Sequence, residues 1–365
     1  MQLLETVSSL GKILEEIASG INIESNFRIT YLNYQPMELA LELANSLQQL
    51  PSDIQNKYLN LQLRTFIYEI YYDGSLKPAI AENLDTDTAI LENNQTRGIE
   101  RNYYTGLESH NCGKGFYEPG WRVVGQEDED LLVRKNDLTL HVKRDSQVEP
   151  SQRNAKINDS VAVLMPKNRL EHGYYVAVGD AGFANMCGPD GDNKIAVDIY
   201  FHFTPQGVFS VMQSLTQQLN AINIPFTFKV VYDPSECEHR NDSGILTIQS
   251  GDYCQIHPIL QQIYSEQAAH FYPNTPLFTK YLAPGLSLAE VPQQKFIPNE
   301  TFGMNRCRIV ANGLLAAYQS GNNTLQTRMS HIQQQFAQMN ISLQYPYLNP
   351  MSENIYSEID CLRKM

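Results

Sequence analysis

The stretch that decides the fold lies at residues 195–232 and reads IAVDIYFHFTPQGVFSVMQSLTQQLNAINIPFTFKVVY. Apolar side chains take every second position over 195–203, as they do in a strand with one buried face. The Thr-Pro pair at 204–205 then supplies an N-cap and a proline for the first helical turn, and apolar residues recur at helical spacing over 208–222. Alternation resumes after Pro225, so the stretch predicts a β-α-β unit.

A second unit of the same kind follows along the chain. Residues 245–248 form a short apolar strand, residues 257–258 are expected to open a helix, and residues 277–278 are expected to begin the returning strand. Two β-α-β units in tandem are typical of a sheet covered on one face by two helices. The predicted fold class is therefore α+β, with the sheet and its helices built from tandem β-α-β units.

The remaining sequence divides into three predicted parts. Residues 1–82 are interpreted as a helical N-terminal subdomain, because apolar residues recur there near a 3.6-residue period. Residues 83–101 are polar and contain few apolar side chains, which is typical of a linker or mobile loop. The α+β domain is expected to span residues 102–365.

The chain is acidic, with 40 Asp and Glu against 27 Lys and Arg and a formal net charge of −13. Such a charge repels nucleic-acid backbones, so we expect no nucleic-acid partner. No apolar run approaches the roughly 18 residues that span a bilayer. The first residues also lack the pattern of a secretory signal. We therefore expect a cytoplasmic protein with no membrane partner, whose anionic substrates need a local group of Lys and Arg.

Neither a cofactor nor a metal is expected. No two of the six cysteines lie closer than the 17 residues between Cys237 and Cys254, so zinc-site spacing is absent and free thiols are predicted. The sequence contains no Walker motif, no dinucleotide fingerprint at a strand–helix junction, no nucleophile elbow and no His-Glu-x-x-His motif.

Four cationic residues stand at positions where sites often form. Lys229 lies on the predicted strand 226–232, on the face opposite the phenylalanines; if it lines a cleft, desolvation makes it a candidate base, and otherwise it faces solvent. Lys280 precedes a Pro-Gly turn. Arg306 and Arg308 lie at the expected start of a helix, where anions bind. Since they are two residues apart, at most one is expected to face a site.

Two further candidates lie in loops. Arg240 is close to Asp242, and the plainer interpretation of that pair is a surface ion pair that contributes little. His110 stands in the segment 109–115, whose glycines let the backbone approach a ligand.

Five separated motifs, in order, carry a resemblance to a known family. They are YEPGWRVV at 117–124, IYFHFTP at 199–205, KVVYDP at 229–234, TKYLAPGL at 279–286 and FGMNRCR at 302–308. Together they resemble the HopA type III effector family over about residues 96–350. Members of that family outside pathogens resemble tailoring enzymes of class V lanthipeptide and thioviridamide-like biosynthesis.

The resemblance implies an activity and its partners. A separate kinase phosphorylates Ser or Thr of a ribosomal precursor peptide, and the HopA-like lyase eliminates the phosphate to leave dehydroalanine or dehydrobutyrine. The resemblance implies Lys229 as the base and places Lys280, Arg306 and Arg240 in phosphate and enolate roles that can permute. Arg308 is the further phosphate-binding candidate at the same helix start.

The resemblance leaves the proton donor open. Phosphothreonine lyases, to which this chemistry is similar, carry a Lys-x-His pair on a strand, and this chain has none. His110 and Tyr200 are the candidate acids, unless phosphate leaves without one.

Two other functions compete with the lyase. A non-catalytic subunit would bind a peptide or a chaperone through the N-terminal helices, and would not need Lys229, Lys280 and Arg306 to converge. A metal-dependent hydrolase would need a group of Asp and His ligands that the sequence does not provide.

Overall fold

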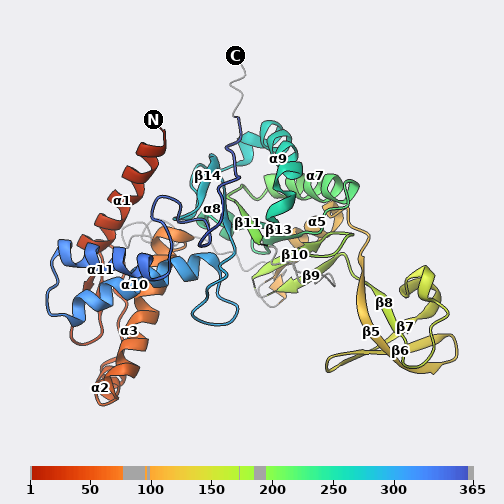
Figure 1. Cartoon of the computed structure of the whole chain (residues 1–365), viewed down its shortest axis with the longest axis horizontal. Coiled ribbons are helices and arrows are strands. Elements are labelled where there is room, and N and C mark those ends of the chain that lie inside the picture. Colours follow the sequence, from red (N-terminus) through yellow and green to blue (C-terminus); the bar gives the residue numbers. More distant parts are fainter. Residues whose placement is uncertain (1, 77–94, 97–98, 172, 185–194, 361–365) are drawn as a thin grey trace.

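The computed structural model describes residues 2–76, 95–96, 99–171, 173–184 and 195–360 of the chain. The predicted α+β class is confirmed, with antiparallel sheets and helices packed against them (Figure 1). The helices are α1 (Gln2–Gly20), α2 (Leu41–Gln48), α3 (Ser52–Ile67), the π-helix η1 (Tyr68–Tyr72), α5 (Arg101–His110), α6 (Arg144–Gln147), η2 (Pro150–Gln152), α7 (Gly207–Ala221), α8 (Glu236–His239), η3 (Ser250–Asp252), α9 (Tyr253–Gln267), η4 (Ala268–His270), α10 (Phe302–Gln319) and α11 (Leu325–Gln338).

A seven-stranded sheet lies at the centre of the molecule. Its strand order is β14-β15-β11-β13-β12-β10-β9, and every neighbouring pair is antiparallel. The strands are β9 (Asn168–Glu171), β10 (Tyr174–Val178), β11 (Ala196–Phe201), β12 (Thr227–Val231), β13 (Gly244–Gln249), β14 (Lys280–Ala283) and β15 (Leu286–Glu290).

The first β-α-β unit is present, although its helix begins at Gly207 with Gln206 as the N-cap, and not at the predicted Thr204-Pro205 pair. Strands β11 and β12 are both antiparallel to β13, which lies between them, so they run parallel to each other and α7 connects them. The second unit differs from the prediction. Helix α9 begins at Tyr253 instead of His257, and the strand that follows it, β14, runs antiparallel to β13 because it pairs antiparallel with β15, which is parallel to β13. The chain changes direction in the segment 268–279, which connects α9 to β14.

Helices α7 and α9 lie side by side over one face of this sheet (Figure 1). The strands present fully buried apolar side chains, such as Ile199, Phe201 and Phe228, to the core. Because successive residues of a strand point to opposite faces, Tyr200 and Lys229 lie on the other face. That second face meets η1 and the start of α10, where the rings of Tyr72 and Tyr200 are 6.1 Å apart.

The N-terminal helices predicted for residues 1–82 are present as α1, α2, α3 and η1 in the described part of that range. They pack against helices of the part predicted as the α+β domain: α1 packs on α11 and α3 packs on α10. Leu14 and Phe66 accordingly belong to the same buried core as Phe228 of the sheet. Most of the predicted linker, residues 83–94 and 97–98, lies outside the described residues; Gln95–Thr96 (β3) pairs with Ile99–Glu100 (β4).

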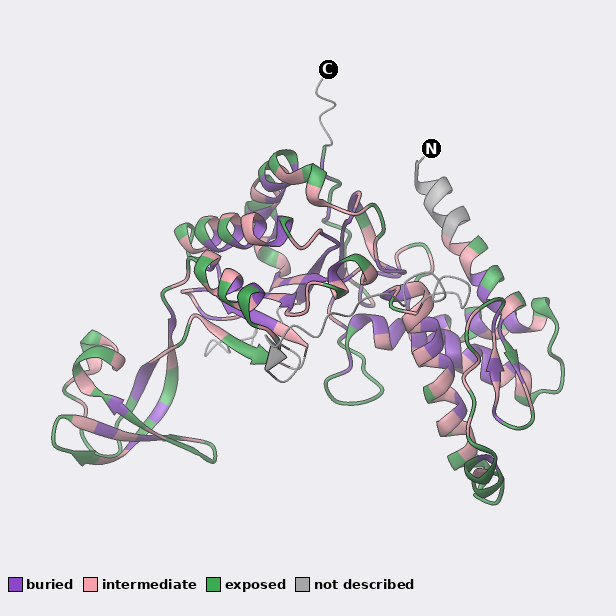
Figure 2. Cartoon of the chain, turned by 180° about the vertical axis from the view of Figure 1, so that it is seen from behind, coloured by how far each residue is buried: buried purple, intermediate pink, exposed green. Residues whose placement is uncertain are grey.

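A second sheet projects from the body of the molecule (Figure 2). It comprises β5 (Phe116–Glu127), β6 (Asp130–Lys135), β7 (Leu138–Lys143) and β8 (Ser160–Met165) in the order β7-β6-β5-β8. Trp121, Val133 and Val161 form a small core of its own. The predicted domain 102–365 therefore contains two separate hydrophobic cores.

Two expectations from composition concern the described residues. Cys112, Cys237, Cys254 and Cys307 are free, as predicted, while Cys187 and Cys361 lie outside the described part. Among the described helices, none combines the length and apolar character needed to cross a membrane.

Candidate functional site

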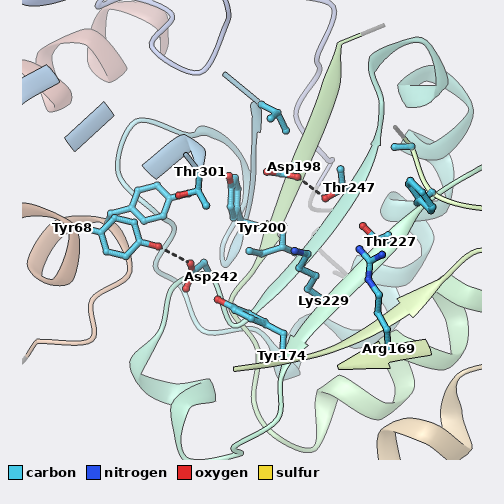
Figure 3. A pocket seen from close by; sticks show the side chains of 15 residues that line it. Tyr68, Arg169, Tyr174, Asp198, Tyr200, Thr227, Lys229, Asp242, Thr247 and Thr301 are labelled. Carbon is cyan, nitrogen blue, oxygen red and sulfur yellow. Dashed lines mark hydrogen bonds between the residues drawn. The ribbon is translucent and has the colours of Figure 1, made fainter. Parts of the chain in front are cut away.

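A pocket of about 310 Å³ lies on the sheet face that α7 and α9 leave uncovered (Figure 3). Several parts of the chain meet there: strands of the sheet, the π-helix η1, the segments that follow β10 and β15, the loop before β13 and the start of α10. The lining residues are Tyr68, Tyr72, Arg169, Tyr174, Phe183, Ala184, Asp198, Tyr200, Thr227, Lys229, Asp242, Ile245, Thr247, Val291 and Thr301.

Strand register explains why polar side chains gather in this pocket. Residues directly opposite each other on neighbouring strands share a face. Thr247 lies opposite both Asp198 and Thr227, and Lys229 lies opposite Ile245. The pocket therefore collects the polar positions of three strands whose alternate positions are buried in the core.

Lys229 lies in the pocket instead of facing open solvent. Its side chain is 29% exposed, and its Nζ forms an ion pair with Oε2 of Glu171 on β9. The other carboxylate oxygen of Glu171 is 2.9 Å from Nη2 of Arg169. Both cations lower the pKa of Glu171 against the opposing effect of burial, which is the largest influence. One carboxylate thus holds an ammonium and a guanidinium together at the edge of the sheet.

Asp198 is one of the two acidic side chains that line the pocket in the described part of the chain, together with Asp242. Thr247 donates a hydrogen bond of 2.6 Å from its hydroxyl to Oδ1 of Asp198 (Figure 3). Burial raises the pKa of Asp198, although the Thr247 hydrogen bond and the charge of Lys229 oppose that shift. A carboxylate with a raised pKa is a stronger base than an ordinary one.

Asp242 is buried and its partner Arg240 is partly buried, so the surface interpretation of that pair is wrong. The Asp242 side chain is 2% exposed, and Nε of Arg240 lies 3.0 Å from its Oδ1. Arg240 also donates a 2.6 Å hydrogen bond from Nη2 to the hydroxyl of Tyr174. Asp242 and Tyr174 line the pocket while Arg240 holds them from behind. Arg240 therefore positions the wall of the pocket.

Asp73, next to this pair, makes the stability of the fold depend on pH. Burial and the neighbouring Asp242 raise the pKa of Asp73 to about 7. Between about pH 4 and about pH 7 the folded chain holds a proton that the unfolded chain has released, so stability falls as pH rises through that range. We expect Asp73→Asn to flatten this fall by up to ~1.4 kcal/mol per pH unit in urea unfolding.

Asparagine keeps the oxygen that accepts hydrogen bonds from the amide and hydroxyl of Ser75, at 2.9 and 2.8 Å. The exposed Asp137→Asn serves as the control and should leave the slope unchanged. An Asp73→Asn variant with the wild-type slope would contradict the assignment.

Arg306 does not face the pocket. It is 1% exposed, and its guanidinium donates to the carbonyls of Pro346 and Leu348 at 2.7 and 3.0 Å and to Oδ1 of Asn305 at 2.6 Å. Burial lowers its pKa to about 10. Arg308 forms an ion pair with the fully buried carboxylate of Glu300, at 3.1 Å. The guanidinium groups of both arginines are therefore bound to protein groups around α10, which corrects their predicted role in binding phosphate.

Lys280 and His110 also lie away from the pocket. Lys280 is on β14, four strands from β12, or about 19 Å at the usual strand spacing, and its Nζ lies over the ring of Tyr347. His110 ends α5 and stacks on Phe209 of α7, on the helix-covered side of the sheet. Of the six predicted site residues, Lys229 alone lines the pocket. Tyr200, the other candidate acid, lines it as well.

Sequence reasoning missed Arg169, Glu171, Asp198 and Tyr174. Asp198 carried a usable signal, because it is the one charged side chain in the apolar strand that opens the deciding stretch. Arg169 and Glu171 carried none, since β9 is only four residues long and shows no clear alternation. Within the described ranges, no group of three or more His, Cys, Asp or Glu side chains is placed to hold a metal ion.

Comparison with known proteins agrees with the four sequence motifs that lie between residues 199 and 308, and the motif at 117–124 lies outside the matched segment. The family model described as the HopA1 effector protein family matches residues 165–348, just over half of the chain. The chain belongs to this family. The matched HopA1 segment begins at the last residue of β8 and contains every strand of the seven-stranded sheet together with α10 and α11.

Two solved structures are similar to this HopA1 family member. An effector protein from Pseudomonas syringae pv. syringae strain 61 is 14% identical, with a TM-score of 0.44, over 84% of this chain and 96% of that one. An effector protein from Pseudomonas syringae pv. tomato strain DC3000 is 15% identical, with a TM-score of 0.43, over 81% of this chain and 96% of that one. A comparison with curated protein sequences gives no match.

Proposed function

We propose that the pocket eliminates phosphate from phosphoserine or phosphothreonine of a peptide. The observation that carries the proposal is the Arg169–Glu171–Lys229 group, in which one carboxylate holds two cations. A second carboxyl group in the same pocket, Asp198, has its pKa raised by burial. This arrangement supplies the parts that a β-elimination needs, which are a base, a cation near the developing enolate and a clamp on the departing phosphate.

Phosphate binding falls to Arg169 and Lys229. A phosphate monoester carries close to two negative charges at neutral pH, so it competes with the single charge of Glu171 for both side chains. Arginine binds phosphate through two parallel N–H donors, and lysine acts as a point charge. The Glu171 carboxylate keeps Lys229 as a charged ammonium. We therefore give Lys229 the role of stabilising the negative charge on the phosphate and the enolate.

Asp198 takes the base role that the family resemblance gave to Lys229. Its carboxylate accepts the α-proton, the electrons of the C–H bond form the new double bond, and the Cβ–O bond breaks with its electrons going to the phosphate. The bound ester is close to the dianion, so its departing oxygen takes a proton from the Lys229 ammonium and leaves as hydrogen phosphate, while the α-proton stays on Asp198. The Tyr200 hydroxyl, on the same wall, serves as a hydrogen-bond donor.

The test is a mass measurement on a synthetic phosphopeptide. The purified protein is incubated with a peptide carrying one phosphothreonine, and the product is weighed and then treated with a thiol. Loss of phosphoric acid and thiol addition to the new double bond support the lyase. Release of phosphate with retention of the threonine hydroxyl would indicate hydrolysis and contradict it. Binding without any change of mass would favour the peptide-binding subunit.

A variant at Lys280 distinguishes the pocket seen in the structure from the site that the sequence predicted. We expect Lys280→Ala to retain wild-type kcat/KM for elimination, because β14 lies at the far edge of the sheet from Glu171 and Arg169. The same peptide assay measures this. A large loss of activity in Lys280→Ala would show that the reaction takes place elsewhere than in the pocket.

A further inference from the structure

The two edges of the seven-stranded sheet differ. At one edge, β14 is covered by the C-terminal segment: the amide of Ile359 donates a 3.0 Å hydrogen bond to the carbonyl of Leu282, and the side chains of Ile359 and Tyr356 are buried. At the other edge, β9 pairs with β10 alone among the described residues. This second edge borders the pocket, because Arg169 lies on β9.

Backbone register shows which groups of β9 face outward. The amide of Val178 donates to the carbonyl of Lys167, directly opposite, which makes that pair a hydrogen-bonded one. Hydrogen-bonded and non-hydrogen-bonded pairs alternate along an antiparallel ladder. Arg169 and Glu171 therefore bond to β10, while the N–H and C=O groups of Asn168 and Leu170 point away from the sheet. Such groups are a ready template for another strand.

We infer that the outer edge of β9 binds an extended segment of the phosphopeptide substrate as an additional strand, which rests on the proposed function for the identity of that peptide. Backbone hydrogen bonds to an exposed edge are a common mode of peptide recognition. The positive charge of Arg169 favours an acidic peptide at this edge, because its side chain is 49% exposed and lies on the pocket face of the same strand. A side chain of the added strand opposite Arg169 lies within about 5.5 Å of it at the Cβ atoms, which favours an acidic residue there.

Strand spacing sets the distance between the bound segment and the reacting residue. An added strand lies about 4.8 Å beyond β9 and hence about 14 Å from β12, which carries Lys229. An extended residue advances about 3.3 Å, so about four residues connect the bound segment to a phosphothreonine in the pocket. The peptide thus leaves the edge and crosses the sheet face over Glu171.

The test uses Leu170→Pro with Leu170→Ala as its matched control. Proline removes the outward N–H, and an edge strand tolerates proline where that N–H faces solvent. Alanine removes the same exposed side chain but keeps the N–H. The probe is a peptide of Thr, Val and Glu residues around one phosphothreonine, and a second probe is cut to about two residues on each side, too short to reach β9 by the spacing above.

We expect Leu170→Pro to raise the KM of the long peptide about tenfold, with kcat and the short peptide unaffected and Leu170→Ala close to wild type. Hydrogen exchange on the wild-type protein gives a second readout that needs no turnover. The Leu170 amide should exchange freely in the free protein and become protected when a long peptide with alanine in place of phosphothreonine is bound.

Several results would overturn the inference. They are a Leu170 amide already protected in the free protein, no protection at saturating peptide, or equal effects of Leu170→Pro on the two peptides. Its failure is distinct from failure of the lyase. Protection of Leu170 without any elimination leaves the peptide site standing and removes the activity. Elimination that Leu170→Pro leaves unchanged supports the lyase activity and removes the peptide site on β9.

Discussion

Lys229→Ala is expected to lower kcat/KM for phosphate elimination by about 10²–10³-fold, the usual effect of removing one preorganised charge-stabilising group. The variant loses the ammonium that meets the phosphate and the enolate, and it leaves Glu171 with Arg169 as its remaining partner. The freed carboxylate then repels the phosphate, which adds to the loss. Elimination of phosphoric acid from the phosphothreonine peptide, followed by mass spectrometry over time, measures the effect.

Two variants control this result. Lys143→Ala removes an exposed lysine from β7 in the separate four-stranded sheet, and it should leave kcat/KM unchanged. Lys229→Arg keeps the positive charge, so a charge-stabilising role predicts partial activity, whereas a proton-abstracting role predicts a loss as large as in Lys229→Ala. Wild-type activity in Lys229→Ala would remove this residue, and the pocket with it, from the reaction.

Arg306→Ala is expected to lower the free energy of unfolding by about 3–5 kcal/mol, because two buried carbonyls each lose a donor at a cost of roughly 1–3 kcal/mol. The guanidinium ties α10 to the segment that contains Pro346 and Leu348. Alanine leaves both carbonyls without their donor and opens a cavity in a region that is nearly inaccessible to water. Urea unfolding followed by circular dichroism measures the loss.

Matched arginine variants separate this structural role from the predicted phosphate role. Arg101→Ala removes an exposed arginine at the start of α5 and should change stability by less than about 0.5 kcal/mol. Arg306→Lys keeps the charge but loses the planar set of donors, so it should also be strongly destabilised. If Arg306→Ala unfolds like the wild type but binds phosphopeptide more weakly, the sequence-based assignment is correct and the structural one is wrong.

Local patterns were sufficient to predict most of the elements. The alternation around Phe228 placed Lys229 on the opposite face from the phenylalanines, and the structure has it there because a strand leaves its side chains no other choice. The same logic does not give strand direction or neighbours. Strand β14 was expected to complete a β-α-β unit, yet the turn at Gly285 makes it pair antiparallel with β15.

Site residues were harder to predict because position along the chain says nothing of which strand ends lie together. Arg306 looked like an anion-binding arginine at a helix start, yet the segment 346–348 occupies its donors. Arg240 looked like a surface residue, yet the N-terminal π-helix covers its partner Asp242, 2% exposed.

The sequence by itself determined the fold class, the central β-α-β unit, the face on which Lys229 stands and the membership of the HopA1 family, because each depends on side-chain periodicity or on motifs within short stretches of chain. Tertiary structure alone decided that Lys229 meets Glu171 and Arg169, since these residues come from strands about 60 positions apart, 229 against 169 and 171, that a third strand joins. It also decided that Lys280 does not join them. Strand order follows from how the whole core packs, and no local pattern encodes it.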